Sequence, residues 1–430
     1  MRLSDTVAST LLARLPLGSG AAAVRRGDST LVGVEPAELV MARGPGAVAC
    51  LDTLAPGFWV GWCAFELGHS LERVVPLAAS TEPAAVPDVM FARFEALAAV
   101  DAEGRITVSG GGPGRALLEL AAHDAYADAA ATAVPGPMLA SPLAPATWHS
   151  SLEREAYHAR VEAILELLAA GECYQVNLTR RLTCAFPIDP VALYGALVYA
   201  HTAPHMAMLR ITVGDRPVAV VSASPERYLQ LRNHGQVESR PIKGTAEARA
   251  VLCASAKDRA ENVIVVDLAR NDLGRVCEPG SISVPSLCAV ESHPGLHHLV
   301  STVRGQLRPE VGIGALVAAT FPPASVTGAP KPRVLQVIEE LEPVRRGVYC
   351  GAFGWIDTRH AERGNVEADL AVAIRTFTIL GEPGEDGACT QLGVGGGIVA
   401  DSDPESEWLE TELKASRLLH VANVPALVVT

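Results

Sequence analysis

The chain has 430 residues, of which 49% are hydrophobic, and it carries a formal charge of −13 at pH 7. Because 48 acidic residues outnumber 35 lysines and arginines, the composition argues against binding to nucleic acid or a membrane surface and favours small molecules or proteins as partners. The length exceeds that of one ordinary core, so two lobes or one large composite domain are expected.

Cysteine usage and hydropathy indicate a cytoplasmic protein. The nine cysteines include no CxxC pair, which predicts single reduced thiols. The first 18 residues are interrupted by Asp5 and Arg14 and therefore lack the apolar core of a signal peptide. We expect no membrane segment, because no uninterrupted apolar run is long enough to span a bilayer.

The chain divides into two predicted regions, residues 1–148 and 149–422. The first contains short strand-like runs, such as FWVGWCAF at 58–65, that are separated by glycine and proline. A proline-rich stretch with hardly any charge follows at 134–148, and this composition is typical of a connector between lobes.

The second region mixes helices and strands. Ser150 and Glu153 have the spacing of a capping box, and Tyr157, Val161 and Ile164 follow at helical spacing. CYQVNLTRRLTCAF then alternates like a strand, and amphipathic helices are predicted at 254–269 and 405–419. Since strands and helices do not alternate regularly, an α+β layered fold is expected.

Two acidic pairs have helical spacing: Asp258 with Glu261, and Glu407 with Glu410. A separation of three residues places both carboxylates of a pair on one face of a helix. Two such helices facing each other would offer hard oxygen ligands to Mg²⁺. Taken separately, each pair is more simply explained as solvated helix surface.

Three segments have features of anion sites. SVTGAPK (325–331) combines a hydroxyl, a glycine and a proline suited to a helix start, so its backbone N–H groups and Lys331 could face a carboxylate. GVGGGIVAD supplies Gly395, Gly396 and Gly397, whose bare backbone lets a ligand approach. Arg375 could grip a carboxylate with two hydrogen bonds. The structural alternatives are a helix-starting turn, a glycine bulge and an edge-strand arginine.

Two further positions carry groups that could react. His298, beside His297 in HHLVST, could carry a proton, although a histidine satisfied inside the core is the commoner outcome. Lys243 lies in PIKGT between Pro241 and Gly244. It is either an exposed lysine in a turn or an amine that attacks carbon.

The region from about residue 150 to 420 resembles the chorismate-utilising enzyme family. The resemblance rests on segments that follow one another in the family's order: YQVNLTRR, SPERYL, RPIKGT, KDRAENVIVVDLARNDLGRV, EPGSISV, HHLVSTVRG, FPPASVTGAPK, EELEPVRRGVYCGAFGWI, IRT and GVGGGIVADSDPESEWLET. FWVGWCAFELGHSLE extends it more weakly into the first region. The resemblance implies antiparallel β-sheets packed as a sandwich and flanked by helices, as in anthranilate synthase component I, and an Mg²⁺-dependent reaction on chorismate.

The resemblance also implies roles for individual residues. Glu261 and Glu410 match the metal ligands, with Asp258 and Glu407 beside them. Glu226 matches the acid that serves proton transfer at the ring hydroxyl, and Lys243 and His298 complete the implied catalytic set. The implied substrate-binding residues are Gln175, Ser325, Thr327, Gly328, Tyr349, Arg375, Gly395, Gly396, Gly397 and Lys414.

Three positions indicate the branch of the family. Members that add water carry a lysine where this chain has Gln175, so ammonia is the expected nucleophile. Lys243 and Ser325 match the aminodeoxychorismate synthases, which place an amine at C4, whereas anthranilate synthases usually have alanine and threonine there. The alternatives are anthranilate synthase component I and a non-catalytic chorismate-binding relative. Because the chain lacks the GxCxG elbow of a glutaminase, a separate glutamine amidotransferase subunit is expected to supply ammonia.

Overall fold

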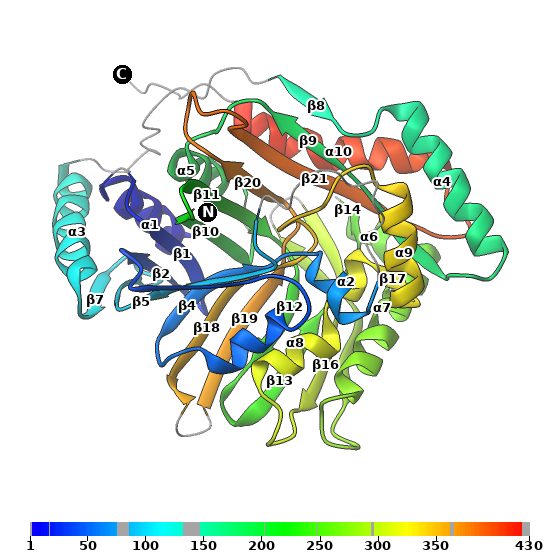
Figure 1. Ribbon diagram of the computed structural model, residues 1–430, viewed down its shortest axis with the longest axis horizontal. Helices are drawn as coiled ribbons and strands as arrows, with labels where there is room; N and C mark the ends of the chain where they lie inside the picture. Colours follow the sequence, from blue (N-terminus) through cyan, green and yellow to red (C-terminus); the bar gives the residue numbers. More distant parts are fainter. Residues whose placement is uncertain are drawn as a thin grey trace.

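The computed structural model describes residues 2–16, 18–74, 86–131, 147–201, 203–246, 248–293, 296–361 and 365–423. Two large antiparallel sheets form the body of the protein, and helices flank them (Figure 1). The predicted α+β sandwich is therefore confirmed. Most of the proline-rich stretch at the predicted boundary, residues 132–146, lies outside the described residues.

The first sheet has eleven strands. Their order is β17 (Gly328–Ala329), β9 (Gln175–Cys184), β21 (Cys389–Ile398), β20 (Thr376–Leu380), β11 (Arg216–Ser224), β10 (His205–Val213), β1 (Ala21–Arg26), β2 (Ser29–Val34), β6 (Ala96–Val100) and β7 (Ile106–Gly110), with β8 (Trp148–Ser150) also paired to β9.

The second sheet has ten strands. They run in the order β14 (Ile242–Ala246), β16 (Leu296–Gln306), β13 (Gln236–Arg240), β12 (Arg227–Leu231), β19 (Asn365–Val372), β18 (Ala352–His360), β4 (Phe58–Cys63), β5 (Val89–Phe94) and β3 (Glu38–Ala42), and β15 (Ser283–His293) pairs with β16.

Both sequence regions contribute to both sheets. In the first sheet β1 pairs with β10, so that Ala21 lies opposite Arg210. In the second, β4 pairs with β18, and Val60 lies opposite Trp355. Neither region therefore has a sheet of its own, and the described residues form one composite layered unit.

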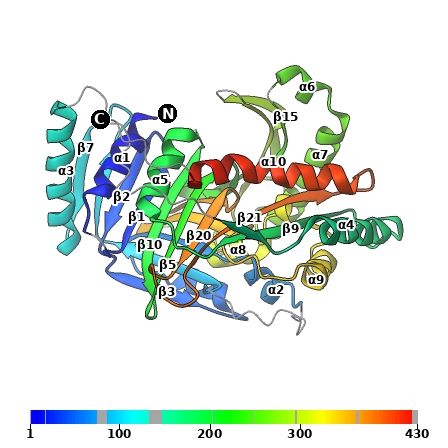
Figure 2. The same ribbon diagram turned by 90° about the horizontal axis from the view of Figure 1, so that it is seen from above.

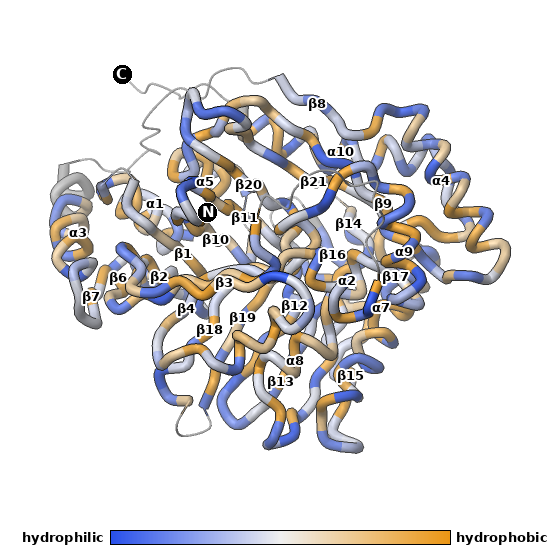
Figure 3. Tube along the Cα trace, viewed as in Figure 1, coloured by the Kyte–Doolittle hydropathy of each residue, from blue (hydrophilic) through white to orange (hydrophobic). Residues whose placement is uncertain are grey.

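Because side chains alternate along each strand, the two faces of the first sheet contribute to two different cores. Val24 of β1, Trp62 of β4, Leu209 of β10 and Phe353 of β18 meet in a core between the two sheets. The other face of the first sheet is covered by α1 (Leu3–Ala13), α3 (Pro113–Ala131), α5 (Pro190–Ala200) and α10 (Pro404–Asn423) over a second core (Figure 2). Hydrophobic residues gather along the central strands, and hydrophilic ones along outer loops and helix faces (Figure 3).

The predicted helices form, with one local correction. The helix α4 (Arg154–Ala169) buries Tyr157, Val161 and Ile164, as its spacing predicts. The capping box is wrong: Ser150 ends β8, and its hydroxyl donates to the carbonyl of Leu152 instead. The pairing of β8 with β9 determines the backbone here and overrides the local capping signal.

The other helices lie mainly around the second sheet and the sheet ends. They are α2 (Leu67–Leu71), α6 (Arg249–Ala254), α7 (Ala256–Gly274), α8 (Ile313–Thr320) and α9 (Lys331–Leu341), with 3₁₀ turns η1 (Ala47–Thr53), η2 (Asn233–Gly235) and η3 (Ala324–Val326). Among the described residues, none of the helices combines the length and the apolar character that a membrane crossing requires.

Candidate active site

Lys243 lies in a strand, and its side chain is mostly buried; it is not a solvated turn residue. It lies in β14, which pairs with β16 across a register shift between Ile242 and Thr245. Its side chain is 12% exposed, and Nζ lies 3.7 Å from Oε2 of Glu261 on α7. Gly244 has a φ of 81°, and a Cβ there would lie 2.7 Å from Cγ of Asp258. Glycine is therefore required for β14 to approach α7 so closely.

The amine of Lys243 also meets the glycine-rich strand β21. A Cβ at Gly397 would lie 3.1 Å from the Lys243 Nζ and 2.6 Å from Nε2 of Gln175. Gln175 is buried, and its Nε2 has no hydrogen-bond partner among the described residues. Buried amide donors are normally paired, so this one indicates a position where a polar ligand group belongs.

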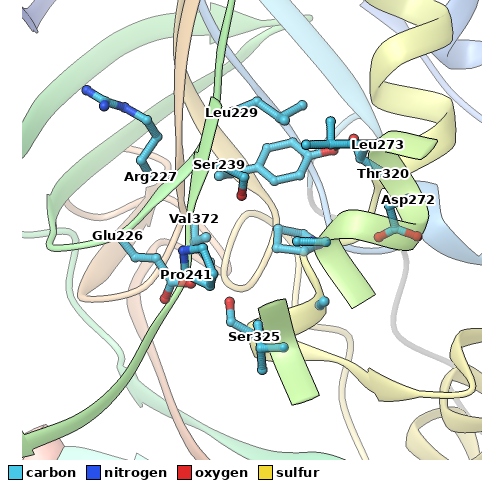
Figure 4. Close-up of a pocket in the computed structure, with 15 residues that line it drawn as sticks. Glu226, Arg227, Leu229, Ser239, Pro241, Asp272, Leu273, Thr320, Ser325 and Val372 are labelled. Atoms are coloured by element: carbon cyan, nitrogen blue, oxygen red, sulfur yellow. Dashed lines mark hydrogen bonds between the residues drawn. The ribbon is translucent and has the colours of Figure 1, made fainter. Parts of the chain in front are cut away.

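Glu226 and Ser325 line a small pocket that extends to Tyr228, Asp272 and Thr320 (Figure 4). Burial raises the pKa of Glu226 to about 7, although the neighbouring Ser325 hydroxyl, Lys243 and the Ile242 amide act in the opposite direction. The buried Oγ of Ser325 lies close enough to this carboxyl group to lower its pKa, but it makes no hydrogen bond of good geometry among the described residues. The site therefore contains a carboxyl group that is protonated to a large extent at neutral pH.

His298 lies on β16, beside the strand that carries Lys243. Thr245 Oγ1 lies 2.8 Å from its Nδ1, a hydrogen bond that fixes the ring. Sequence reasoning missed Thr245, and the irregular register between Ile242 and Thr245 means that strand alternation could not have placed its side chain. The structure thus brings His298 and Lys243 to adjoining strands.

Four carboxylates of α7 and α10 belong to one electrostatic cluster. Burial raises the pKa of Glu261, and Asp258 and Glu410 act in the same direction, against the opposing lysines 243 and 257. Burial alone would also raise the pKa of Glu410, but Lys414, Lys243 and Lys257 together lower it. Lys243 and Lys257 therefore act on both predicted principal ligands, Glu261 and Glu410.

Lys257, which sequence reasoning missed, lies between the acids of the two helices. Its Nζ is 4.0 Å from Oε1 of Glu261 and 3.7 Å from Oε1 of Glu407. Ser402 donates a 2.6 Å hydrogen bond to the same oxygen of the buried Glu407. A cation thus already bridges α7 and α10 in this structure.

The oxygen donors suit Mg²⁺ in chemistry. In the described part of the chain, no three His, Cys, Asp or Glu side chains are grouped closely enough to hold an ion as they stand. Carboxylates from two facing helices, with ammonium groups between them, nevertheless form a site where a divalent cation could replace the lysine amines. The donor set fits the ion, while the enclosing geometry would require side-chain rearrangement.

The predicted glycines and Lys414 surround this cluster. Lys414 Nζ donates to the Gly395 carbonyl at 2.8 Å and pairs with Oε1 of Glu410 at 2.6 Å. A Cβ at Gly396 would lie 3.0 Å from Oε2 of Glu407. The bare backbone of β21 therefore runs directly beside the acids of α10.

Thr327 and Gly328 attach the segment containing Ser325 to strand β9. The Asn177 amide donates to the Thr327 carbonyl at 2.8 Å, and Gly328 of β17 pairs with Val176 of β9. The side chain of Thr327 is turned inward and donates to the Pro323 carbonyl. Its hydroxyl therefore stabilises the segment in this structure.

The two residues expected to bind the enolpyruvyl carboxylate have different surroundings. Tyr349 packs over Gly393, where a Cβ would overlap its ring. Burial lowers the pKa of Arg375, and the positive charge of Arg417 on α10 adds to this effect. None of the described hydrogen bonds or ring contacts links Tyr349 to Arg375, so their joint role remains a prediction.

Lys331 faces a carboxylate, but that carboxylate belongs to the protein. Its buried Nζ donates to Oδ2 of Asp272 at 2.7 Å and to the Thr320 carbonyl at 2.9 Å. The helix α9 begins at Lys331, with Pro330 at its N-cap. The anion site expected around this lysine is thus replaced by an internal ion pair.

Comparisons with known proteins identify related sequences. The family model for chorismate binding enzymes matches residues 29–420. The chain is 42% identical to aminodeoxychorismate synthase component 1 of Klebsiella aerogenes over 64% of this chain and 59% of that protein. It is 34% identical to anthranilate synthase component 1 of Mycolicibacterium smegmatis over 87% of this chain and 73% of that protein.

The fold has solved counterparts. Anthranilate synthase component I from Streptococcus pneumoniae superposes with a TM-score of 0.73 at 25% identity, covering 92% of this chain and 93% of that one. The match to the Klebsiella protein spans under two thirds of that relative's length. With a family model that spans most of the sequence, the chain belongs to the chorismate binding enzyme family.

Proposed function

We propose that the protein is an aminodeoxychorismate synthase component I, which converts chorismate and ammonia to 4-amino-4-deoxychorismate on the route to 4-aminobenzoate and folate. The observation that carries the proposal is the position of the Lys243 amine. It lies 3.7 Å from Glu261 and reaches the backbone of Gly397 beside Gln175. An amine at this position can act as a nucleophile toward the ring, and a relative at 42% identity that carries this name supports the assignment.

The proposed reaction consists of two allylic displacements. The Lys243 nitrogen bonds to C2 of the ring, both ring double bonds shift, and the C4–O bond breaks as Glu226 gives its proton to the departing hydroxyl, which leaves as water. Ammonia then bonds to C4, the double bonds shift back, and the C2–N bond to Lys243 breaks. Lys243 leaves as the free amine. The new C4 ammonium group then gives one proton back to the Glu226 carboxylate, so both residues return to their starting states.

The remaining residues bind and orient the substrate. The Gln175 amide lies beside Lys243 and the Ser325 hydroxyl lies beside Glu226. Both are among the buried polar groups that make no hydrogen bond of good geometry in the described structure, so they are the proposed donors to the polar groups of chorismate. Glu261 and Glu410 would hold a divalent cation, whose charge would neutralise the ring carboxylate. The ammonia is proposed to come from a separate glutamine amidotransferase subunit.

Product analysis tests the proposal. The protein is incubated with chorismate, Mg²⁺ and ammonium, with and without an aminodeoxychorismate lyase. We expect 4-aminobenzoate only when the lyase is present. Anthranilate formed without the lyase would show that the protein is an anthranilate synthase component I instead, and chorismate binding without turnover would identify a non-catalytic relative.

Gly397→Ala is expected to weaken chorismate binding. The added methyl group would lie 2.6 Å from Gln175 Nε2 and 3.1 Å from Lys243 Nζ, so one of these groups must leave its place. We expect KM for chorismate to rise at least about tenfold, which corresponds to about 1.4 kcal/mol. Gly111→Ala is the control, because a Cβ there meets nothing within 4 Å; equal kinetics for the two variants would contradict the prediction.

Removal of divalent cations is expected to abolish turnover, with recovery when Mg²⁺ is restored. Glu261→Gln removes one proposed ligand charge, so the Kd for Mg²⁺ measured by titration calorimetry should rise about 10- to 100-fold. Asp267→Asn is the matched control on the same helix, because Asp267 is exposed and pairs with Arg270. An unchanged Mg²⁺ affinity in Glu261→Gln would exclude Glu261 as a ligand.

A further inference from the structure

A buried ion pair outside the reacting groups connects the predicted substrate-binding segments. Arg346 lies between α9 and Tyr349 in the sequence and pairs with Glu342, and both side chains are less than 5% exposed. The Arg346 Nη2 donates to Oε1 of Glu342 at 2.6 Å, and its Nε donates to Oε2 at 2.9 Å. This is a bidentate pair, whose geometry only a guanidinium provides.

The remaining donors of Arg346 bind two backbone carbonyls. Nη1 donates to the carbonyl of Val326 at 2.8 Å, and Nη2 donates to that of Asn177 at 2.6 Å. Val326 lies between Ser325 and Thr327 in the sequence, and Asn177 lies two residues after Gln175. One guanidinium thus spans the segment that carries Ser325 and the strand that carries Gln175.

Glu342 extends this connection along β9. Its Oε1 also accepts a 2.8 Å hydrogen bond from the Thr179 amide. The pair therefore binds β9 at two places, the Asn177 carbonyl and the Thr179 amide. Such a buried pair is costly to desolvate, and it persists where every donor and acceptor is satisfied.

Residues of the first region of the sequence, Phe65 and Glu66, also contact Arg346. The buried Glu66 accepts hydrogen bonds from the Arg346 amide at 2.8 Å and from the Gly347 amide at 3.1 Å. The guanidinium also lies 4.2 Å from the centre of the Phe65 ring. The segments FELGHSLE and ELEPVRRG, which have no role in the proposed reaction, therefore meet at this residue.

We infer that Arg346 is a positioning residue that, through Glu342 and Glu66, sets the separation between Ser325 and Gln175. It touches neither the reacting groups nor the cavity of Glu226, so it acts only through the segments that it holds. Displacement of a substrate-binding group by about 1 Å can cost about 10²-fold in rate. The kinetic part of this inference rests on the proposed function, whereas its structural part does not.

The test compares Arg346→Lys with a matched control. Lysine keeps the charge, but one ammonium group cannot bind both Glu342 oxygens and reach two carbonyls as well. The control is Arg25→Lys: the guanidinium of Arg25 is buried, pairs with Asp5 and donates to the carbonyls of Ala203 and Pro204. Both variants lose guanidinium hydrogen bonds to a carboxylate and to two backbone carbonyls. Only Arg346→Lys loses a hydrogen bond to the segment 323–328, which contains Ser325.

Hydrogen exchange and kinetics are measured on both variants. We expect Arg346→Lys to accelerate amide exchange at Val326 and Thr327 and to lower kcat/KM for chorismate about 10²-fold, while Arg25→Lys changes neither by more than about twofold. If Arg346→Lys does not fold, Glu342→Gln replaces it as the test variant, because it removes the charge of the carboxylate that pairs with Arg346. Unchanged exchange at residues 323–328, or an equal kinetic loss in Arg25→Lys, would overturn the inference. If the wild-type protein does not turn over chorismate, the proposed function fails and the exchange data alone decide.

Discussion

Replacing Lys243 with alanine is expected to abolish C4 amination and the covalent adduct with it. Loss of a nucleophile that forms an intermediate removes most of the catalysis, so we expect kcat to fall by about 10³-fold or more. In intact-protein mass spectra, the wild-type enzyme incubated with chorismate and no ammonium should gain the mass of chorismate less one water. The variant should show no such species.

The structure provides a control for this experiment. Lys257 lies within 4.0 Å of Glu261, like Lys243, but it is half-exposed. Lys257→Ala should still form the adduct, because this lysine lies on α7 and not beside Gly397. An adduct that survives in Lys243→Ala and disappears in Lys257→Ala would transfer the nucleophilic role to the helix lysine.

Glu226→Gln is expected to give the second largest loss, about 10²- to 10⁴-fold in kcat, because the departing hydroxyl loses its proton donor. A general acid must be protonated to act. Burial raises the pKa of Glu226 to about 7, so the contribution of this group to kcat/KM should be full at pH 6 and fall tenfold per unit above about pH 7. The variant should lack this decline. A wild-type profile without a step near pH 7 would exclude Glu226 as the acid.

Stability measurements separate this effect from misfolding. Because the folded-state pKa of Glu226 lies above that of an ordinary glutamate, the folded state binds this proton more tightly than the unfolded state does. The wild-type protein therefore loses stability as the pH rises from about 4.5 to about 7, while Glu226→Gln does not have this dependence. At pH 8 the variant should be at least as stable as the wild type, and Glu310→Gln, a change at an exposed carboxylate, should alter neither rate nor pH profile.

Local sequence patterns predicted the elements that carry the acids. The positions of Glu261 and Glu410 on helices follow from the hydrophobic period and from the three-residue spacing of each acid pair, which are properties of a single turn. The strand containing Gln175 is likewise a local pattern. The same locality explains the failure at Ser150, where a capping signal competed with strand pairing and the pairing prevailed.

The order of motifs along the chain indicated the family, but the joint environment of those motifs was decided by tertiary structure. Lys243 lies on the second sheet and Gly397 on the first, so their contact depends on how the two sheets meet. One of the two alternatives for Lys243 was an exposed residue in a turn, but the residue lies in a strand, because β14 pairs with β16 across a register shift. No pattern in either segment contains that information.

The sequence by itself therefore determined the helices that carry the acid pairs, the strand of Gln175 and the family. The tertiary structure decided that Glu226 is buried enough to hold its proton near neutral pH, that Lys257 bridges two helices, and that the N-terminal region reaches Arg346 through Glu66. The physical reason is range: a helix or strand period is set by neighbours in the chain, whereas burial and charge pairing depend on groups that only folding brings together.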